Sequence, residues 1–378
     1  MDDSHAPASG NAALKSRLLR QLDQQVAAAP SPMASVAPRA RRAMQLARHG
    51  ALSEAREALT TLHQLSFQHP HADIGAWLHL AEGLMTYYNG FSAQPAQERI
   101  QRAHAIAASH AGMEEVQVLA DAWLAQLAFV RHDLDGMIQH ARRCLAVARE
   151  NEDHGALARL GMALGLSWHY AGDGDAAQRW YQRARRHAAT EGDDTTLSAL
   201  MFNMAAMRVA LLRRESLNAR VRVQEMLLSV DSIRHYDAAV GAAMMNELTP
   251  VLRAQVLTVE GRFEEARALY EQHLPQAMSL GLERLGSSLL SDVAWCRANS
   301  GQPELALRQA REAEVELDPS CELDDRAITH SRLAQVFALL GEAADAQRHD
   351  ALAKEAWDQF ASQQQHWRDA LLESGLTG

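Results

Sequence analysis

The chain has 378 residues, of which 37 are lysine or arginine and 47 are aspartate or glutamate, so its formal charge is -10. Only 5% of the residues are aromatic, while helix-forming Ala, Leu, Arg and Gln are frequent, and this composition favours helices over strands. The acidic balance argues against a broad nucleic-acid-binding surface. No apolar run approaches the roughly 20 residues of a membrane-spanning helix, so no contact with a membrane is expected.

The first residues and the cysteines bear on the compartment. Residues 1–10 are acidic and lack the apolar core of a secretory signal. Cys144, Cys296 and Cys321 are scattered without CxxC spacing, which argues against a disulfide framework and against a structural zinc site. These features favour a cytoplasmic protein.

The first segment, residues 1–35, is predicted to lie outside the main fold. Residues 1–12 are expected to be disordered, and residues 13–29 form a predicted helix. Apolar residues recur every four positions along one face of this helix, at Leu14, Leu18, Leu22 and Val26. A tether rich in proline and serine follows from Pro30. The apolar face is expected to cap the first repeat, to compete for a groove within the chain, or to dock a partner.

Residues 36–348 contain a turn signature that recurs about every 40 residues with helical patterns on both sides. The clear copies begin at Gly50, Gly172, Gly261, Gly301 and Gly341. Weaker copies occur near Gly90, at His132-Asp133-Leu134 and near Arg213-Arg214. In each clear copy the glycine can end one helix with positive φ, and a small residue five positions later lets the next helix approach closely. The pattern predicts eight helical hairpins.

The last segment, residues 349–378, is predicted to be a capping helix and a tail. Residues 350–372 have helical periodicity, with Leu352, Ala356, Phe360 and Trp367 near one stripe. The end of a repeat array must cover an apolar face, and this helix is expected to do so.

The signature resembles the tetratricopeptide repeat (TPR). The best copy has Leu164-Gly165, Gly172, Ala177, Tyr181 and Ala184 at the matching positions. Two further copies match at Val293-Ala294, Gly301, Ala306 and Ala313, and at Leu333-Ala334, Gly341, Ala346 and Ala353. The period near 40 exceeds the usual 34 and is similar to the long repeats of kinesin light chains, MalT-type regulators and peptide-sensing Rap-like proteins. HEAT repeats have a similar length but lack this corner.

The resemblance implies an all-α fold, a right-handed superhelical solenoid of about eight TPR-like repeats with terminal capping helices. The first helix of each repeat would then line a concave groove that binds a protein or peptide. Among residues that could form the clamp that some TPR proteins use for C-terminal carboxylates, only Arg159 and Asn203 are present, so that specificity is not predicted.

No catalytic motif is apparent, and we assign no catalytic residue and no cofactor. The chain lacks a GxSxG elbow, a P-loop, a GxGxxG fingerprint and an HExxH motif. His69-Pro70-His71 and the group His132, Asp133 and Asp135 lack the spacing of metal ligands on helices, so no metal site is expected. Cys144 falls on a packed helix face, where a thiol is usually inert.

Charge is distributed unevenly along the repeats. Arginines cluster on or beside the second helices of the middle repeats, at Arg142-Arg143, Arg183/Arg185/Arg186, Arg213-Arg214 and Arg220/Arg222. Acidic residues gather before the last repeat, at Glu312, Glu314, Glu316, Asp318, Glu322, Asp324 and Asp325. These groups are either solvated outer faces or surfaces that steer charged partners.

Aligning the first helices predicts the residues of the groove. One equivalent position holds Met44, Gln126, Leu166, Met207, Gln255, Trp295 and Gln335. One turn earlier lie Met162, Asn203 and Ser291, and about one turn later lie Phe129 and His169. Flexible thioethers and carboxamides suit an extended or helical peptide, although each residue could instead pack against the neighbouring repeat.

The sequence therefore predicts a non-catalytic, bacterial-type scaffold or adaptor that binds a protein or peptide. The alternative is a ligand- or peptide-responsive regulator that acts through a separate output partner. An enzyme would require convergent titratable groups inside the groove.

Overall fold

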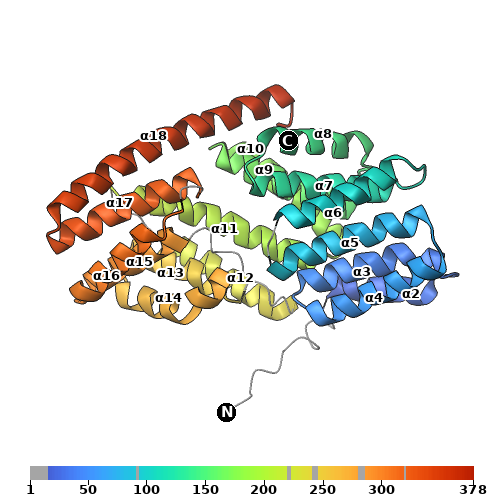
Figure 1. The fold of residues 1–378 in the computed structure, drawn as a ribbon, viewed down its shortest axis with the longest axis horizontal. Coiled ribbons are helices and arrows are strands. Elements are labelled where there is room, and N and C mark those ends of the chain that lie inside the picture. Colours follow the sequence, from blue (N-terminus) through green and yellow to red (C-terminus); the bar gives the residue numbers. More distant parts are fainter. Residues whose placement is uncertain (1–15, 91–92, 219–222, 241–245, 280–285, 319–320) are drawn as a thin grey trace, which may run out of the picture. The chain divides into compact units, whose positions relative to one another are not determined.

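The structure is a computed structural model that describes residues 16–90, 93–218, 223–240, 246–279, 286–318 and 321–378. Within these ranges the chain is helical and contains no strand. Helix α2 (Arg17–Ala28) and a short 3-10 turn (Met33–Ser35) precede eight successive helix pairs, which form an all-α repeat array (Figure 1).

The pairs follow one another along the chain, and in each the first-named helix is called the first helix. They are α3 (Val36–Arg48) and α4 (Leu52–Gln68), α5 (Ala72–Gly90) and α6 (Ala93–Ala108), α7 (Glu114–Val130) and α8 (Leu134–Val147), α9 (His154–Tyr170) and α10 (Gly174–Glu191), α11 (Asp194–Ser216) and α12 (Gln224–Val240), α13 (Leu248–Glu260) and α14 (Phe263–Ala277), α15 (Gly286–Asn299) and α16 (Pro303–Val315), and α17 (Leu323–Leu340) and α18 (Ala343–Ser374).

The predicted corners join the helices of these pairs. All five glycines of the clear copies have positive φ, between 74° and 86°. At the weaker corner after α7, His132 takes the left-handed conformation with φ 55°, and Asp133 caps α8 by accepting a hydrogen bond from the Gly136 N–H. Asp173 caps α10 in the same way. These side chains satisfy N–H groups that have no partner within the helix.

Small residues bring the helices of a pair together, as the α9–α10 pair shows. A Cβ placed on Gly165 would lie 2.4 Å from the Tyr181 ring, and one on Gly161 would lie 3.0 Å from the Ala184 Cβ. Any larger residue at Gly165 would therefore force the two helices apart. The TPR-like matches at Gly165, Tyr181 and Ala184 thus correspond to a packed seam.

Helix α11 departs from two expectations. It continues to Ser216, so Arg213 and Arg214 lie inside a first helix and not at a corner. Among the described helices, α11 is the one that is long and apolar enough to cross a membrane, judged by length and composition alone. The expectation that no segment of the chain meets this test is therefore corrected. Core helices of folded proteins pass the same test, and 33% of the most apolar window of α11 is buried here.

The chain divides into two compact units, which are described separately below. Unit 1 comprises Met1–Leu200, Tyr236–Met244 and Trp367–Gly378, and unit 2 comprises Met201–His235 and Met245–His366. Helices α11, α12 and α18 contribute residues to both. Because α18 runs without a break from Ala343 to Ser374, the second helix of the last repeat and the predicted C-terminal helix are one element.

Each unit has its own apolar core. In unit 1 a continuous cluster joins α3 to α7 and includes Leu62, Ile74 and Ile100. In unit 2 the buried residues form clusters between successive pairs, represented by Val209, Tyr270 and Phe337. Apolar burial of this kind, repeated between neighbours, is what stabilises a repeat array.

Candidate functional site

In unit 1 the first helices converge on a cavity of about 80 Å³. Residues of α3, α5, α7 and α9 line it together with the residues that precede and begin α11. The first and fifth repeats meet here, because the Arg48 guanidinium lies 2.7 Å from Asp193 and the Gln45 amide donates to Thr195 at 2.9 Å. Burial would raise the pKa of Asp193, but Arg48 and two threonine hydroxyls hold that pKa well below its ordinary value.

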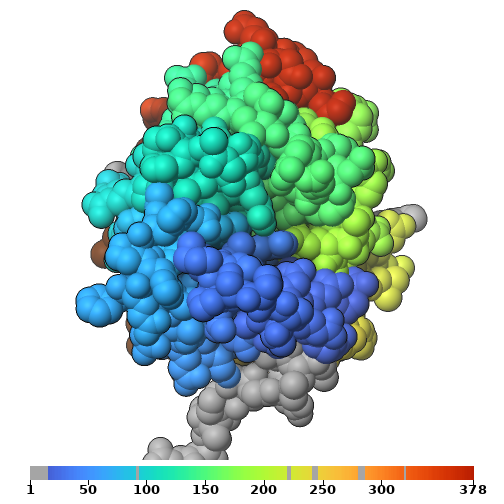
Figure 2. Space-filling view, turned by 90° about the vertical axis from the view of Figure 1, so that its right-hand side faces the viewer, coloured from blue at the N-terminus to red at the C-terminus, as the bar shows by residue number. Residues whose placement is uncertain are grey.

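Helix α2 covers one side of this cavity. Ser16 caps it, and Leu18, Leu19 and Leu22 are its buried residues. It packs along α3 at the surface of unit 1 (Figure 2), while Leu18 and Leu22 line the cavity. The predicted helix start at residue 13, Leu14 and the segment 1–12 lie outside the described residues.

Arg159 of α9 lies at the wall of the same cavity and is 94% buried, since only 6% of its surface is exposed. Its guanidinium carbon stands 4.0 Å from the centroid of the Trp123 ring, and its Nη1 donates to the Met162 sulfur at 3.3 Å. Among the described residues, no carboxylate forms an ion pair with it. Burial lowers the pKa of this guanidinium, as expected for a cation removed from water.

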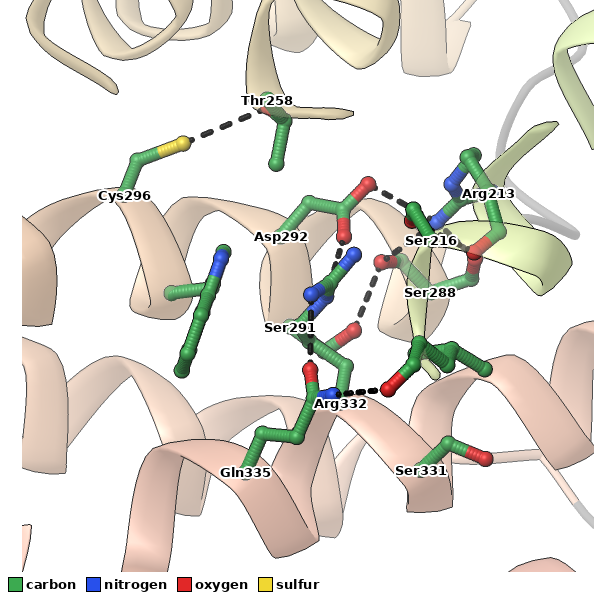
Figure 3. Close-up of polar contacts among 12 residues, drawn as sticks. Arg213, Ser216, Thr258, Ser288, Ser291, Asp292, Cys296, Ser331, Arg332 and Gln335 are labelled. Carbon is green, nitrogen blue, oxygen red and sulfur yellow. Dashed lines mark hydrogen bonds and ion pairs between the residues drawn. The ribbon is translucent and has the colours of Figure 1, made fainter. Parts of the chain in front are cut away.

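Unit 2 contains a buried charge network on its first helices (Figure 3). The fully buried Asp292 of α15 lies 2.9 Å from Arg213 of α11 and 3.0 Å from Arg332 of α17. Arg213 also donates to the Ser288 hydroxyl at 2.8 Å. Two guanidinium groups thus share one carboxylate, and the network joins three first helices.

Gln335 extends this network. It accepts a hydrogen bond from Arg332 at 2.8 Å and donates to the main-chain oxygen of Leu217 at 3.0 Å (Figure 3). The Arg332 guanidinium also lies over the Trp295 ring, 5.3 Å from its centroid. The carboxamide at position 335 therefore bonds a main chain in this structure, but the main chain is the protein's own.

The predicted groove residues of unit 1 are mostly covered. Met44, Gln126, Met162 and Leu166 are buried. Phe129 is half-buried against Trp367, with ring centroids 5.9 Å apart. His169 is half-buried near Tyr181, with centroids 6.3 Å apart.

The predicted groove residues of unit 2 are more open. Asn203 and Met207 of α11 are half-buried, as are Trp295 and Gln335, whereas Gln255 and Ser291 are buried. The Trp295 ring meets Phe263 edge to face at 6.2 Å. Their role in binding stays a prediction.

The alignment of first helices did not single out the charged residues of the two sites. Asp292 and Arg332 each lie three positions before a predicted groove residue, and they are one repeat period apart. This spacing is the sequence signal that could have predicted both residues as members of one site. The interpretation of Arg213 as part of a charged second-helix face is wrong, because the side chain is buried in α11 against Asp292. Arg220 and Arg222 lie outside the described residues.

The candidate metal and thiol residues have ordinary structural surroundings. His71 accepts a hydrogen bond from the Asp73 N–H at the start of α5. Cys144 is buried, and burial raises the pKa of its thiol. In the part of the chain that the structure describes, one acidic group has ligand atoms within 4.8 Å of one another, namely Glu322, Asp324 and Asp325. It lies at the N-terminus of α17, where the helix dipole stabilises negative charge.

Neither a protein-family model nor a curated protein sequence matches the chain. Among solved structures, a crystal structure of a Rap protein complexed with competence and sporulation factor is similar, with a TM-score of 0.57 and 12% sequence identity. The similarity covers 88% of this chain and 100% of that one. It therefore extends over both units, and at this identity it shows the fold alone. Together with the helix pairs and their corners, it shows that the chain has a TPR-like helical repeat fold.

Proposed function

We propose that this protein binds a peptide or a segment of another protein on the first helices of unit 2 and carries out no catalysis of its own. One observation carries the proposal: the half-buried residues Met207, Trp295 and Gln335 recur at the repeat period on first helices. A half-buried tryptophan and a thioether supply apolar contact area. The Gln335 carboxamide uses one N–H for Leu217 and one lone pair for Arg332, which leaves one donor and one lone pair for a peptide main chain. The Rap structure supports the proposal, because that array was crystallised in complex with a factor.

The experiment is a peptide selection against the full-length protein, followed by affinity and melting measurements on the same samples. Met207→Ala and Trp295→Ala should each weaken binding of a selected peptide by about tenfold or more, as truncation of a binding hot spot does. They should lower the melting temperature only slightly, because both side chains are half-buried.

Leu228→Ala is the matched control, since Leu228 lies on the second helix α12 and is 69% exposed. It should leave the affinity unchanged. If all three variants bind alike, or if loss of binding follows loss of stability, then these residues are core and the proposed binding face is wrong.

A regulator that responds to a peptide or ligand and acts through a separate output partner is the second candidate. The similarity to the Rap complex favours it. Both candidates use the same face, and they differ in the consequence of binding. Hydrogen exchange that slows only at the bound residues supports a scaffold or adaptor, whereas changes that spread over successive helix pairs support a regulator.

A further inference from the structure

The tail segment, residues 375–378, follows α18 and lies against α9 and α10 of unit 1. Gly375 ends the helix with a φ of 74°, a conformation that glycine adopts without strain. The Leu376 side chain is buried, whereas Gly375 and Thr377 on either side of it are exposed. One apolar side chain therefore anchors a short, non-helical stretch of main chain.

Two arginines bind main-chain oxygens at the two ends of this stretch. Arg142 of α8 donates through Nε and Nη2 to the Ser374 oxygen, at 3.2 and 2.9 Å. Arg179 of α10 donates through the same two atoms to the Thr377 oxygen, at 3.2 and 2.8 Å. A guanidinium donates hydrogen bonds and accepts none, so both positions select carbonyl oxygens.

Two buried tryptophans bind the oxygen between these ends. The indole N–H groups of Trp168 in α9 and Trp180 in α10 both donate to the Leu376 main-chain oxygen, at 2.6 and 3.2 Å. The two tryptophans are 1% and 3% exposed. A buried N–H group without an acceptor is costly. A ligand that replaces the tail segment must therefore present an oxygen at this point.

Two positions of the tail segment are also selected by their side chains. The apolar Leu376 side chain is 5% exposed. A Cβ placed on Gly378 would lie 3.2 Å from the Arg179 Cβ and 3.3 Å from the Trp180 Nε1, so a small residue fits best there. The surface therefore suits a short peptide in which glycine follows leucine after one intervening residue.

The tail segment can leave without disturbing the helices that hold it. The two tryptophans lie on α9 and α10, which pack against each other along the seam of Gly161 and Ala184. The tail segment is not part of that seam. A tethered segment competes at an effective concentration of the order of millimolar, so it fills the surface until a tighter ligand arrives.

We propose that this surface is a second peptide-binding site, where a partner protein's segment with leucine and glycine in this spacing displaces the tail segment. The four donors then bind main-chain oxygens of the partner, and its leucine takes the place of Leu376. Recognition of main-chain groups together with one side-chain pocket is a common way to bind peptides. The site lies in unit 1 and does not depend on the proposed binding face of unit 2.

The first test needs no partner and uses the full-length chain. Both indole N–H groups lose their acceptor when the tail segment leaves, so their hydrogen exchange, followed by NMR, measures how often it leaves. Arg142→Met removes both hydrogen bonds to the Ser374 oxygen and should accelerate this exchange about fivefold or more.

Arg143→Met is the matched control for this exchange measurement. Arg143 is exposed on the same helix, and none of the described hydrogen bonds joins it to residues 374–378. It should leave the indole exchange unchanged. Equal exchange in the two variants would show that Arg142 does not hold the tail segment, and the inference would be overturned.

The second test uses a labelled probe peptide with the sequence of residues 372–378. Leu376→Ala in the full-length chain removes the apolar anchor but keeps the main-chain oxygen, so the chain's own tail segment competes less. The probe should bind this variant at least tenfold more tightly than the native chain. A probe that itself carries Leu376→Ala should lose at least tenfold in affinity for the variant. Equal binding of the probe to both chains, or binding to neither, would overturn the inference.

A third peptide tests whether partner sequences fit the site. It keeps the residues of the probe at positions 375, 376 and 378 and has alanine at the others. It should bind Leu376→Ala within about threefold of the probe, because the donors bind main-chain oxygens. Loss of its binding would restrict the site to the chain's own sequence and overturn the inference. A dimer of the native chain that dissociates in Leu376→Ala would identify a second copy as the occupant, which would also overturn it.

Discussion

Asp292 illustrates at the scale of single residues how a buried charge can be indispensable without being strongly stabilising. The carboxylate is fully buried and serves two guanidinium groups, from Arg213 and Arg332. The three groups together carry one excess positive charge. Removing the carboxylate leaves two buried cations, whereas removing one arginine leaves a neutral pair.

We therefore expect Asp292→Asn to lower the free energy of unfolding by about 3–5 kcal/mol and Arg332→Met by only about 1 kcal/mol. Urea denaturation of both variants beside the parent protein checks the order. Equal losses would mean that packing and not charge balance dominates at this site.

Substitution of the single residue Gly172 tests the predicted corner between α9 and α10. Its φ of 78° is strained for a β-branched side chain, so Gly172→Val should destabilise unit 1 by about 1–2 kcal/mol. Gly174→Ala is the control, because a Cβ there meets nothing within 4 Å and its φ is not positive. That exchange should be neutral or stabilising by up to about 1 kcal/mol. Thermal melts that do not separate the two variants would contradict the assigned corner.

At the scale of elements, the C-terminal tail is held in unit 1 by donors from α9 and α10. The Trp168 indole N–H donates to the Leu376 main-chain oxygen at 2.6 Å, and the Trp180 indole N–H donates to the same oxygen at 3.2 Å. The Leu376 side chain is buried as well. The tail after α18 thus fastens the end of that helix to the fourth repeat.

Truncation after Ser374 removes this acceptor and should destabilise unit 1 by about 2 kcal/mol or more, because two indole donors lose their partner and the Leu376 side chain is lost. Truncation after Thr377 keeps the acceptor and should cost little. Tryptophan fluorescence during urea denaturation follows the loss directly. Identical midpoints for the two truncations would show that the tail does not contribute to stability.

At the scale of the whole molecule, each unit contains a pair of histidines joined through Nδ1, with His187, His330 and His349 buried and His154 half-buried. His154 and His187 lie 2.9 Å apart in unit 1, and His330 and His349 lie 3.0 Å apart in unit 2. Such a contact requires that one Nδ1 donates and the other accepts, so a second proton breaks it. Burial lowers the pKa of His187 and His349, and burial together with His349 lowers the pKa of His330 to about 4.

These shifts give the chain an acid-sensitive stability. A histidine whose pKa is lowered by folding binds more protons when unfolded, so stability falls as the pH drops below about 6.5. For His330 the expected loss between pH 7 and pH 5 is about 2 kcal/mol. The charged groups that act on the pair are Glu314, Asp345, Arg311, Arg326 and Arg348. Arginine neighbours lower the pKa values of Glu314 and Asp345, so both carboxylates stay ionised over this interval.

His330→Gln keeps a hydrogen-bonding side chain but removes the titration, so its loss of stability between pH 7 and pH 5 should be smaller than that of the parent by about 2 kcal/mol. Urea denaturation at the two pH values measures both losses. If the variant loses as much stability between pH 7 and pH 5 as the parent protein does, then groups other than His330 cause the acid sensitivity.

The local sequence alone determined the helix pairs and their corners. Gly50, Gly172, Gly261, Gly301 and Gly341 have the predicted positive φ, because a helix end depends on the few residues around it. The weak corner at Arg213-Arg214 was placed too early, since no glycine there ends α11.

Only the tertiary structure decided which side chains meet across repeats. The contact of Arg48 with Asp193, the sharing of Asp292 by two arginines, and the cavity that Arg159 lines together with Leu18 and Leu22 bring together residues distant in sequence. Such contacts depend on how each pair is rotated against the next. Small rotations add up over successive repeats, and residue patterns within one repeat do not encode their sum.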